Sequence, residues 1–365
     1  MTFTTQAYIR TNAFSAIGND ISKMSEFWLE FDTQKGMEPA LEQIDSNHYL
    51  CTYRGDGDDG WAVVLTVDTG TWNVSKEVAF AYDVKGLGPA LAKIDPTHYL
   101  CAYQGDGDDG WATIFKVNTG SWTISEEDNF EFDQSKGETP ALVQIDQTHY
   151  LCAYAGPGDD GWAVVLSIAA PLFDAISMGI PFEFDTKKGK TPALSKIDDT
   201  HYLCAYHGDG DDGWATVLTV DTGTWAITKG TPFEFDANKG MEPALAKIDE
   251  MHYLCTYLTN GDVGLVTVLT VDTGTWAITN QTPIEYDTVG MTPALSNIDA
   301  THCLCAYMGP FSDGWSVVLT VDSGNWTVSK ETPFEFDVVD GASPALAKID
   351  DNHYLCAYSG LGEER

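Results

Sequence analysis

Hydrophobic and polar positions alternate in four short segments that recur along the whole chain. In the copy that begins at Pro192 the segments are PALAKID, HYLCAY, GWATVLTV and one that ends in FEFD, all rich in aromatic and β-branched residues. Turn-forming combinations separate them: DDT, GDGDDG, DTGT and NKG. The pattern predicts four antiparallel strands and no helix in each copy.

The copies repeat at the length of a propeller blade. Pro-Ala-Leu begins at residues 39, 89, 140, 192, 243, 293 and 344, a spacing of 50 to 52 residues. Four strands within one such repeat form the blade of a β-propeller, a ring of typically about 4–8 blades. We therefore expect an all-β, seven-bladed β-propeller that forms a single domain over residues 1–365.

The two ends of the chain predict how the ring closes. The seventh copy stops after its second strand, HYLCAY at residues 353–358, whereas residues 1–32 precede the first copy and end in EFD. We expect residues 1–32 to supply strands three and four of the closing blade. Pairing both ends in one sheet leaves no exposed edge there.

The turn expected between strands three and four carries a recognisable motif, TVDTGTW, at residues 66–72. It recurs at 219–225 and 270–276, more loosely at 116–122 and 320–326, and is lost at 167–173. It resembles the Asp box of sialidase-like propellers. That resemblance implies a structural hairpin on the face opposite the ligand site, with Asp68 bonding the turn amides and Trp72 packed beneath the turn.

The resemblance does not extend to sialidase activity. Those enzymes hold the substrate carboxylate with three arginines around the channel. This chain has three arginines in total, Arg10, Arg54 and Arg365, and their positions do not bring them together. We therefore do not expect a sialidase.

Charge excludes several classes of partner. The chain has 19 Lys+Arg against 55 Asp+Glu, a net charge of −36. It should repel phosphate backbones and anionic lipids, so nucleic acid is not expected as a partner. No apolar run reaches the ~18–20 residues of a membrane span, and no signal peptide is visible. The acidity favours an extracellular or cell-surface location, whereas eight unpaired cysteines favour the cytoplasm.

The loop between strands two and three suggests a ligand site in each blade. It combines carboxylates with a following tryptophan, a combination suited to sugar rings and their hydroxyls. The structural alternative is a solvated acidic hairpin beside a tryptophan packed between blades. The candidate ligand-binding residues are Trp61, Asp56, Asp58, Trp111, Asp106, Asp108, Trp162, Asp159, Trp214, Asp209, Asp211 and Trp315.

A partial match to calcium-binding loops adds a second hypothesis for the same loops. The third spaced Asp and the bidentate Glu of such loops are missing. The candidate Ca²⁺ ligands are Asp56, Asp58, Asp106, Asp108, Asp209 and Asp211. We expect no other cofactor.

Three further repeated positions have structural interpretations. The histidine that begins strand two is expected to bond the turn Asp or a carbonyl of its own blade, and the cysteine of strand two to be buried and unpaired. Strand one should line the channel with a polar ring, formed by Gln43, Lys93, Gln144, Lys196, Lys247, Asn297 and Lys348.

The repeats contain no recognisable catalytic motif. No nucleophile elbow, phosphate loop or dinucleotide fingerprint occurs, and near-identical blades do not bring unequal residues to one spot. We therefore expect a non-enzymatic, multivalent, lectin-like module that binds a glycan or surface polymer at a cell or matrix surface. The alternatives are a structural protein or interaction scaffold that self-associates, and a hydrolase or lyase with its site in the channel.

Overall fold

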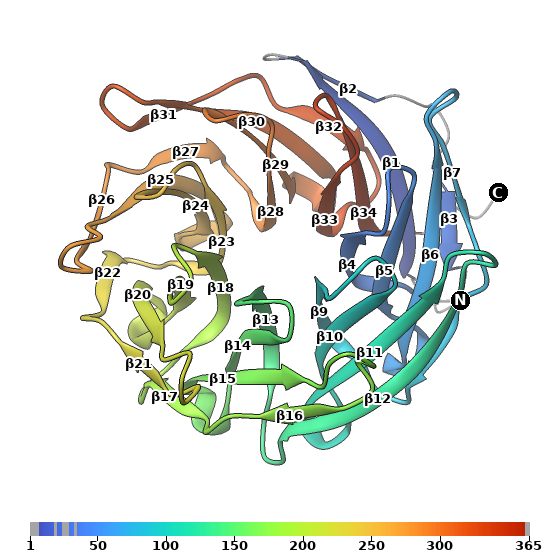
Figure 1. The fold of residues 1–365 in the computed structure, drawn as a ribbon. Coiled ribbons are helices and arrows are strands. Elements are labelled where there is room, and N and C mark those ends of the chain that lie inside the picture. Colours follow the sequence, from blue (N-terminus) through green and yellow to red (C-terminus); the bar gives the residue numbers. More distant parts are fainter. Residues whose placement is uncertain (1–6, 18–19, 24–28, 33–34, 362–365) are drawn as a thin grey trace, which may run out of the picture.

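The computed structural model describes residues 7–17, 20–23, 29–32 and 35–361. In these residues seven antiparallel sheets radiate from a central channel (Figure 1). The same residues contain no α-helix, and no helix among them is long and apolar enough to cross a membrane. The prediction of an all-β, seven-bladed propeller is confirmed. We number the blades one to seven by the Pro-Ala-Leu copy in their first strand.

The strands of blades one to three follow the four-segment pattern. Blade one contains β4 (Met37–Gln43), β5 (His48–Arg54), β6 (Gly60–Asp68), β7 (Asn73–Lys76) and β8 (Phe80–Asp83). Blade two contains β9 (Leu87–Lys93), β10 (His98–Gln104), β11 (Gly110–Asn118) and β12 (Thr123–Asp133). Blade three contains β13 (Glu138–Gln144), β14 (His149–Ala155), β15 (Gly161–Ile168), β16 (Ile176–Met178) and β17 (Phe182–Asp185).

Blades four to six repeat the same arrangement. Blade four contains β18 (Lys190–Lys196), β19 (His201–His207), β20 (Gly213–Val220), β21 (Ile227–Lys229) and β22 (Phe233–Asp236). Blade five contains β23 (Met241–Lys247), β24 (His252–Leu258), β25 (Gly264–Val271), β26 (Ile278–Asn280) and β27 (Ile284–Asp287). Blade six contains β28 (Met291–Asn297), β29 (His302–Met308), β30 (Gly314–Asp322), β31 (Thr327–Lys330) and β32 (Phe334–Asp337).

Both ends of the chain meet in blade seven. It contains β33 (Ala342–Lys348) and β34 (His353–Leu361) from the C-terminal end, and β1 (Ala7–Ile17), β2 (Asp20–Lys23) and β3 (Leu29–Asp32) from the N-terminal end. The sheet order is β2-β1-β34-β33, with β3 also paired to β1. The predicted closure by the N-terminal strands is confirmed. Residues 1–6, 18–19 and 24–28 of the predicted closing segment lie outside the described residues.

The core lies between neighbouring blades. At the seam between blades one and two, Leu50 and Val64 pack against Tyr99, Cys101 and Phe115. All eight cysteines are buried and unpaired, as expected. Burial raises the thiol pKa, to about 12 for Cys101. These thiols therefore stay protonated and act as apolar packing groups.

The Asp-box hairpin forms a seam contact that the sequence did not predict. Asp68 Oδ1 accepts the Gly70 amide at 2.9 Å, as the resemblance implies. Trp72, however, stacks on His353 of the neighbouring blade, with ring centroids 3.9 Å apart. Equivalent stacks occur at four other seams, His48–Trp122, His149–Trp225, His201–Trp276 and His252–Trp326.

The strand-two histidines are structural, as the sequence indicated. His48 Nδ1 lies 2.8 Å from Asp45 Oδ1 in the turn that precedes it. The same His–Asp contact, between 2.7 and 3.0 Å, is found in the other six blades. Each imidazole is thus held by its own turn and, at most seams, covered by the next hairpin.

Candidate functional site

The channel mouth is formed where the chain enters the first strand of each blade. There the residue before the conserved proline is left-handed, with φ between 43° and 53°. This conformation is unusual for a residue before proline and strained for all but glycine. The pairing register of strands one and two shifts at the same place, between Met37 and Ala40 in blade one. Such a bulge re-aims a side chain.

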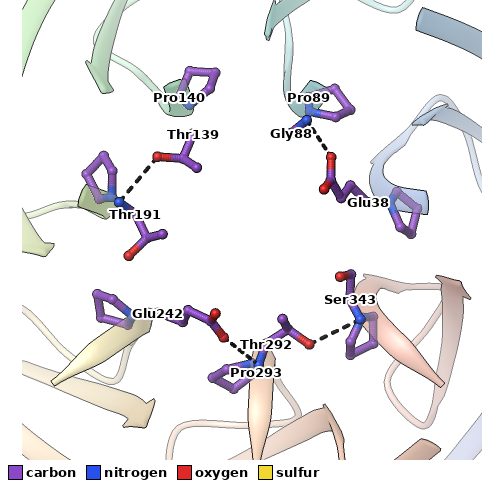
Figure 2. Close-up of a pocket in the computed structure, with 14 residues that line it drawn as sticks. Glu38, Gly88, Pro89, Thr139, Pro140, Thr191, Glu242, Thr292, Pro293 and Ser343 are labelled. Carbon is purple, nitrogen blue, oxygen red and sulfur yellow. Dashed lines mark hydrogen bonds between the residues drawn. The ribbon is translucent and has the colours of Figure 1, made fainter. Parts of the chain in front are cut away.

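The seven re-aimed residues surround one cavity of about 290 Å³ (Figure 2). Their prolines complete the wall. Unlike most positions of the repeat, the residue before the proline differs in chemistry from blade to blade. The seven residues are Glu38, Gly88, Thr139, Thr191, Glu242, Thr292 and Ser343.

Hydrogen bonds connect the ring residues from one blade to the next (Figure 2). Glu38 Oε2 accepts the Gly88 amide at 2.9 Å, and Glu242 Oε2 accepts the Thr292 amide at 2.9 Å. Thr139 and Thr292 use their Oγ1 atoms in the same way, at 3.2 and 3.1 Å. These bonds fix the side chains at the mouth.

The ring of bonds is incomplete: among the described residues no such bond joins blade two to three, four to five, or seven to one. Gly88 has no side chain to reach the next blade. The Thr191 hydroxyl is buried and has no hydrogen-bond partner among the described residues. A buried hydroxyl without a partner costs free energy that a ligand can recover. Blade four therefore leaves a hydroxyl at the mouth without a bond.

The two glutamates approach the mouth from opposite sides, from blades one and five (Figure 2). Burial raises the pKa of Glu242, against the opposing effect of the Thr292 amide. Glu38 instead lies beside a guanidinium, with its Oε1 3.4 Å from Arg54 Nη1. The two carboxyl groups therefore lie in unequal surroundings, one buried and the other beside a guanidinium.

A third acid lies deeper, in the first strand of blade one. Glu42 occupies the position that holds Ala92, Ala246 and Ala347 in blades two, five and seven. Burial raises its pKa to about 7, although Lys93 opposes the shift. This carboxyl is thus partly protonated at neutral pH, unlike an ordinary glutamate.

The acidic loops predicted as ligand sites form ion pairs with lysines in the connections that lead from strand four to the next strand one. Each includes a short 3₁₀ turn: η1 (Asp56–Asp58), η2 (Asp106–Asp108), η3 (Pro157–Asp159), η4 (Asp209–Asp211), η5 (Asn260–Asp262) and η6 (Pro310–Ser312). Asp58 accepts from Lys35 Nζ at 2.8 Å, and Asp108 from Lys85 Nζ at 3.0 Å. Lys136 and Lys188 make the same contact in the next loops, with Asp159 and Asp211.

These lysines set the charge state of the loops. Lys35 and Arg54 lower the pKa of Asp58, and Lys188 with His207 lowers the pKa of Asp211 to about 2. Asp56 and Asp106 are exposed at the loop tips, and Asp209 pairs with Lys187 at 2.9 Å. Among the described residues no group of three His, Cys, Asp or Glu side chains is placed to hold a metal ion. The calcium hypothesis stays a prediction.

The five loop-face tryptophans are half-buried rather than free platforms. Trp61, Trp111, Trp162, Trp214 and Trp315 each pack against a seam core. Trp61 also covers Gly55, where a Cβ atom would lie 2.4 Å from its Cδ1. Beside Trp214, Asp209 and Asp212 border a separate cavity of about 370 Å³. The structure keeps these candidates apart, one set per blade, and their role as ligand sites stays a prediction.

Solved structures share this architecture at low sequence identity. A candidate 6-phosphogluconolactonase from Bacteroides fragilis is 12% identical, with 92% of this chain and 98% of that one aligned and a TM-score of 0.64. The periplasmic gluconolactonase of Pseudomonas aeruginosa is 12% identical over 89% of this chain and 96% of that one, with a TM-score of 0.67. A hypothetical selenium-binding protein from Sulfolobus tokodaii is 8% identical over 98% and 94%, with a TM-score of 0.61.

No protein-family model and no curated protein sequence matches the chain. The Asp-box resemblance therefore stays confined to the hairpin. At 8–12% identity the solved neighbours establish a shared fold.

The neighbours nevertheless correct the functional expectation drawn from the sequence. Two of these three propellers are described as gluconolactonase-type enzymes. These neighbours contradict the expectation of a non-enzymatic, lectin-like adhesion module, and that interpretation is not retained. Of the interpretations drawn from the sequence, the hydrolase with its site in the channel agrees best with these neighbours.

The residues of the channel mouth escaped the sequence analysis because near-identical blades seemed to exclude unequal residues at one spot. A signal was present. The residue before each Pro-Ala-Leu varies among Glu, Gly, Thr and Ser, whereas the tripeptide itself is constant. In a closed ring one variable position per blade converges at the axis.

Proposed function

We propose that the protein is a hydrolase whose active site is the channel mouth, and that it opens an uncharged cyclic ester of the sugar-lactone class. The observation that carries the proposal is the pair of unequal glutamates, Glu38 and Glu242, facing one cavity among hydroxyl groups. The gluconolactonase descriptions of two solved propellers of the same fold support the substrate class.

The chemistry assigns Glu242 the proton transfers. Water adds to the lactone carbonyl while the Glu242 carboxylate takes one of its protons. The raised pKa of Glu242 suits it to accept a proton near neutral pH better than an ordinary carboxylate. The protonated acid then returns the proton to the ring oxygen as the carbon–oxygen bond breaks, which releases a hydroxy acid.

The remaining ring residues would bind and orient the substrate. The Thr191 hydroxyl, buried and without a partner among the described residues, is available to donate to the developing oxyanion or to a sugar hydroxyl. Glu38, held by Arg54 and the Gly88 amide, can accept from a hydroxyl on the opposite side. The cavity of about 290 Å³ suits a small ring rather than a polymer.

Charge argues against a phosphorylated substrate. The chain carries a net charge of −36, and two carboxyl groups lie at the mouth itself. A dianionic phosphate would be repelled both at long range and at the site. An uncharged lactone is not repelled at long range or at the site.

The test is lactone hydrolysis measured in a pH-stat with glucono-1,5-lactone, after subtraction of the spontaneous rate. Glu242→Thr places in blade five the residue that blades three, four and six already carry, so the fold and the bond to the next blade should persist. We expect this variant and Glu242→Gln to lose about 10²–10⁴-fold in kcat. Glu285→Gln, an exposed substitution in β27 of the same blade, is the matched control and should retain the wild-type rate.

Two results would overturn the proposal. One is a wild-type protein that does not exceed the spontaneous rate with any of a set of five- and six-membered sugar lactones. The other is a folded Glu242→Gln variant as active as the wild type.

A further inference from the structure

The far end of the channel has a different lining from the mouth. The first strands run inward from the mouth, and Lys247 follows Glu242 by five positions, a distance of about 17 Å along a strand. At this end four lysines occupy equivalent places in their blades: Lys93, Lys196, Lys247 and Lys348. The polar ring expected from the sequence therefore contains four lysines, although each is followed two residues later by a turn aspartate, as Lys247 is by Asp249.

Each lysine is held in place by the preceding blade. Lys247 Nζ donates to the Ile197 carbonyl at 2.8 Å, and Lys348 Nζ to the Ile298 carbonyl at 3.1 Å. Lys93 and Lys196 make the equivalent bonds at 2.8 and 2.9 Å. An ammonium group has three N–H donors, so such a bond leaves further donors for a ligand.

Two of these lysines pair with exposed carboxylates. Lys348 lies 3.6 Å from Asp351, whose side chain is 99% exposed, and Lys196 pairs similarly with the exposed Asp199. Such solvated pairs contribute little. For Lys247 no carboxylate lies within ion-pair distance among the described residues. The blade-five side of the ring therefore carries the least compensated charge.

A cavity lies at this point. It has a volume of about 380 Å³ and is bordered by Lys247, Ser296, Asn297 and Lys348 together with two leucines. Two ammonium groups supply charge, and Ser296 supplies a hydroxyl. The amide of Asn297 is already bonded to the Lys247 carbonyl at 2.8 Å, so it shapes the wall.

We propose that this basic ring binds a small polyhydroxy carboxylate between Lys247 and Lys348. The choice of a sugar acid rests on the proposed function, because opening a lactone produces such an anion. The ammonium groups would bind the carboxylate, and Ser296 would bind a hydroxyl. A monoanion is favoured over a dianion because the surrounding protein has a large negative charge.

The chain itself supplies a substitution that removes the charge without removing the seam bond. In blade six Asn297 replaces the lysine and still donates to the preceding blade. Lys247→Asn/Lys348→Asn should therefore fold with the wild-type thermal midpoint. The control is Lys229→Asn/Lys330→Asn. These lysines also donate to carbonyls of the preceding blade, but from the outer strands.

Binding of gluconate is measured by titration calorimetry at low salt, on wild type and both double variants. We expect wild type and control to bind alike, the Lys247/Lys348 variant to bind at least tenfold more weakly, and wild-type binding to weaken as salt increases. Unchanged affinity in the Lys247/Lys348 variant, or no binding by wild type, would contradict the proposal. Tighter binding of inorganic phosphate than of gluconate would refute the carboxylate assignment.

This measurement is independent of catalysis. Gluconate binding without lactone hydrolysis would leave the basic site standing and remove the proposed activity. Hydrolysis without gluconate binding would do the reverse.

Discussion

Arg10 Nη1 donates to Asp337 Oδ2 at 3.0 Å, across 327 residues of sequence, and both side chains are buried. Asp337 also accepts from the Tyr358 hydroxyl at 3.0 Å. In other blades the equivalent aspartate has the tyrosine contact, as in Tyr103–Asp83 at 2.7 Å. Arg10 pairs with Tyr358 in the strand register where Trp61 pairs with Tyr53. In the closing blade, Arg10 thus takes the place of a packing tryptophan and forms a buried ion pair with Asp337.

Breaking the Arg10–Asp337 ion pair should destabilise the folded protein strongly. Arg10→Met leaves Asp337 buried without its cation, and we expect a loss of about 3–5 kcal/mol in the free energy of unfolding. Lys116→Gln, which removes an exposed pair with Glu127, should cost less than about 1 kcal/mol. Urea unfolding of the two variants checks the contrast. Equal losses in the free energy of unfolding would show that the Arg10–Asp337 pair contributes no more than a surface ion pair.

The rate of lactone hydrolysis should depend on the ionisation of Glu242. Burial raises the Glu242 pKa, and the proton acceptor must be ionised. We expect kcat/KM to rise with pH through a pKa above the ordinary value of about 4.3 for glutamate. The pH profile from 4 to 7 measures this limb, which should be missing in Glu242→Gln. A limb of the same position in that variant would assign it to another group.

Glu42→Ala should stabilise the protein at neutral and alkaline pH. The folded pKa of Glu42 is about 7, above its unfolded value, so ionisation opposes folding. The penalty is absent below the unfolded pKa, grows as the pH rises toward 7 and then stays constant. We expect a gain of about 1–3 kcal/mol at pH 8, and little change at pH 4 beyond that of removing the side chain. Chemical unfolding at the two pH values tests it, and a loss of stability at pH 8 would refute it.

Acid should weaken the turn that precedes each strand-two histidine. Although burial opposes the shift, hydrogen bonds from the Thr301 amide and His302 lower the pKa of Asp299 to about 2. A carboxyl with a depressed folded pKa stabilises the protein above its unfolded pKa, near 3.9, and this stability is lost as the pH falls toward 2. Asp299→Asn should therefore destabilise at pH 6 more than at pH 2. Thermal melts at both pH values measure the difference.

The loop-face tryptophans should tolerate leucine better than alanine. Blade five already has Leu265 at this position, packed against the same kind of seam core as Trp214. Because these side chains are half-buried, Trp214→Ala should cost about 2–4 kcal/mol and Trp214→Leu about half as much. Calorimetric melting distinguishes the two. Alanine and leucine variants as stable as the wild type would show that Trp214 does not support the seam.

The fold was predictable because each blade repeats a complete set of local signals. The register of Pro-Ala-Leu gave the number of blades, and the half-units at the two ends gave the closing strands. The His–Asp contact was also local, since His48 bonds to an aspartate three residues away. Contacts between residues of the same repeat can therefore be predicted from the sequence of that repeat.

Contacts between repeats could not be read in this way. Trp72 reaches His353, and Arg10 reaches Asp337, only because the ring brings separate segments together. The left-handed Glu242 precedes a proline, where local preference favours an extended backbone. Tertiary packing overrides that preference, so the direction of the side chain toward the mouth depends on the assembled ring.

The closing blade also determines how the protein would respond to mechanical force. β1 and β34 are antiparallel, and Ala7 pairs with Leu361 at one end of their ladder. A pull on the two ends of the described chain therefore peels the strands apart one bond at a time rather than shearing all of them together. The peeling front meets Arg10 and its buried partner after three residue pairs. The Arg10–Asp337 pair is thus placed where the ring would first resist being pulled open.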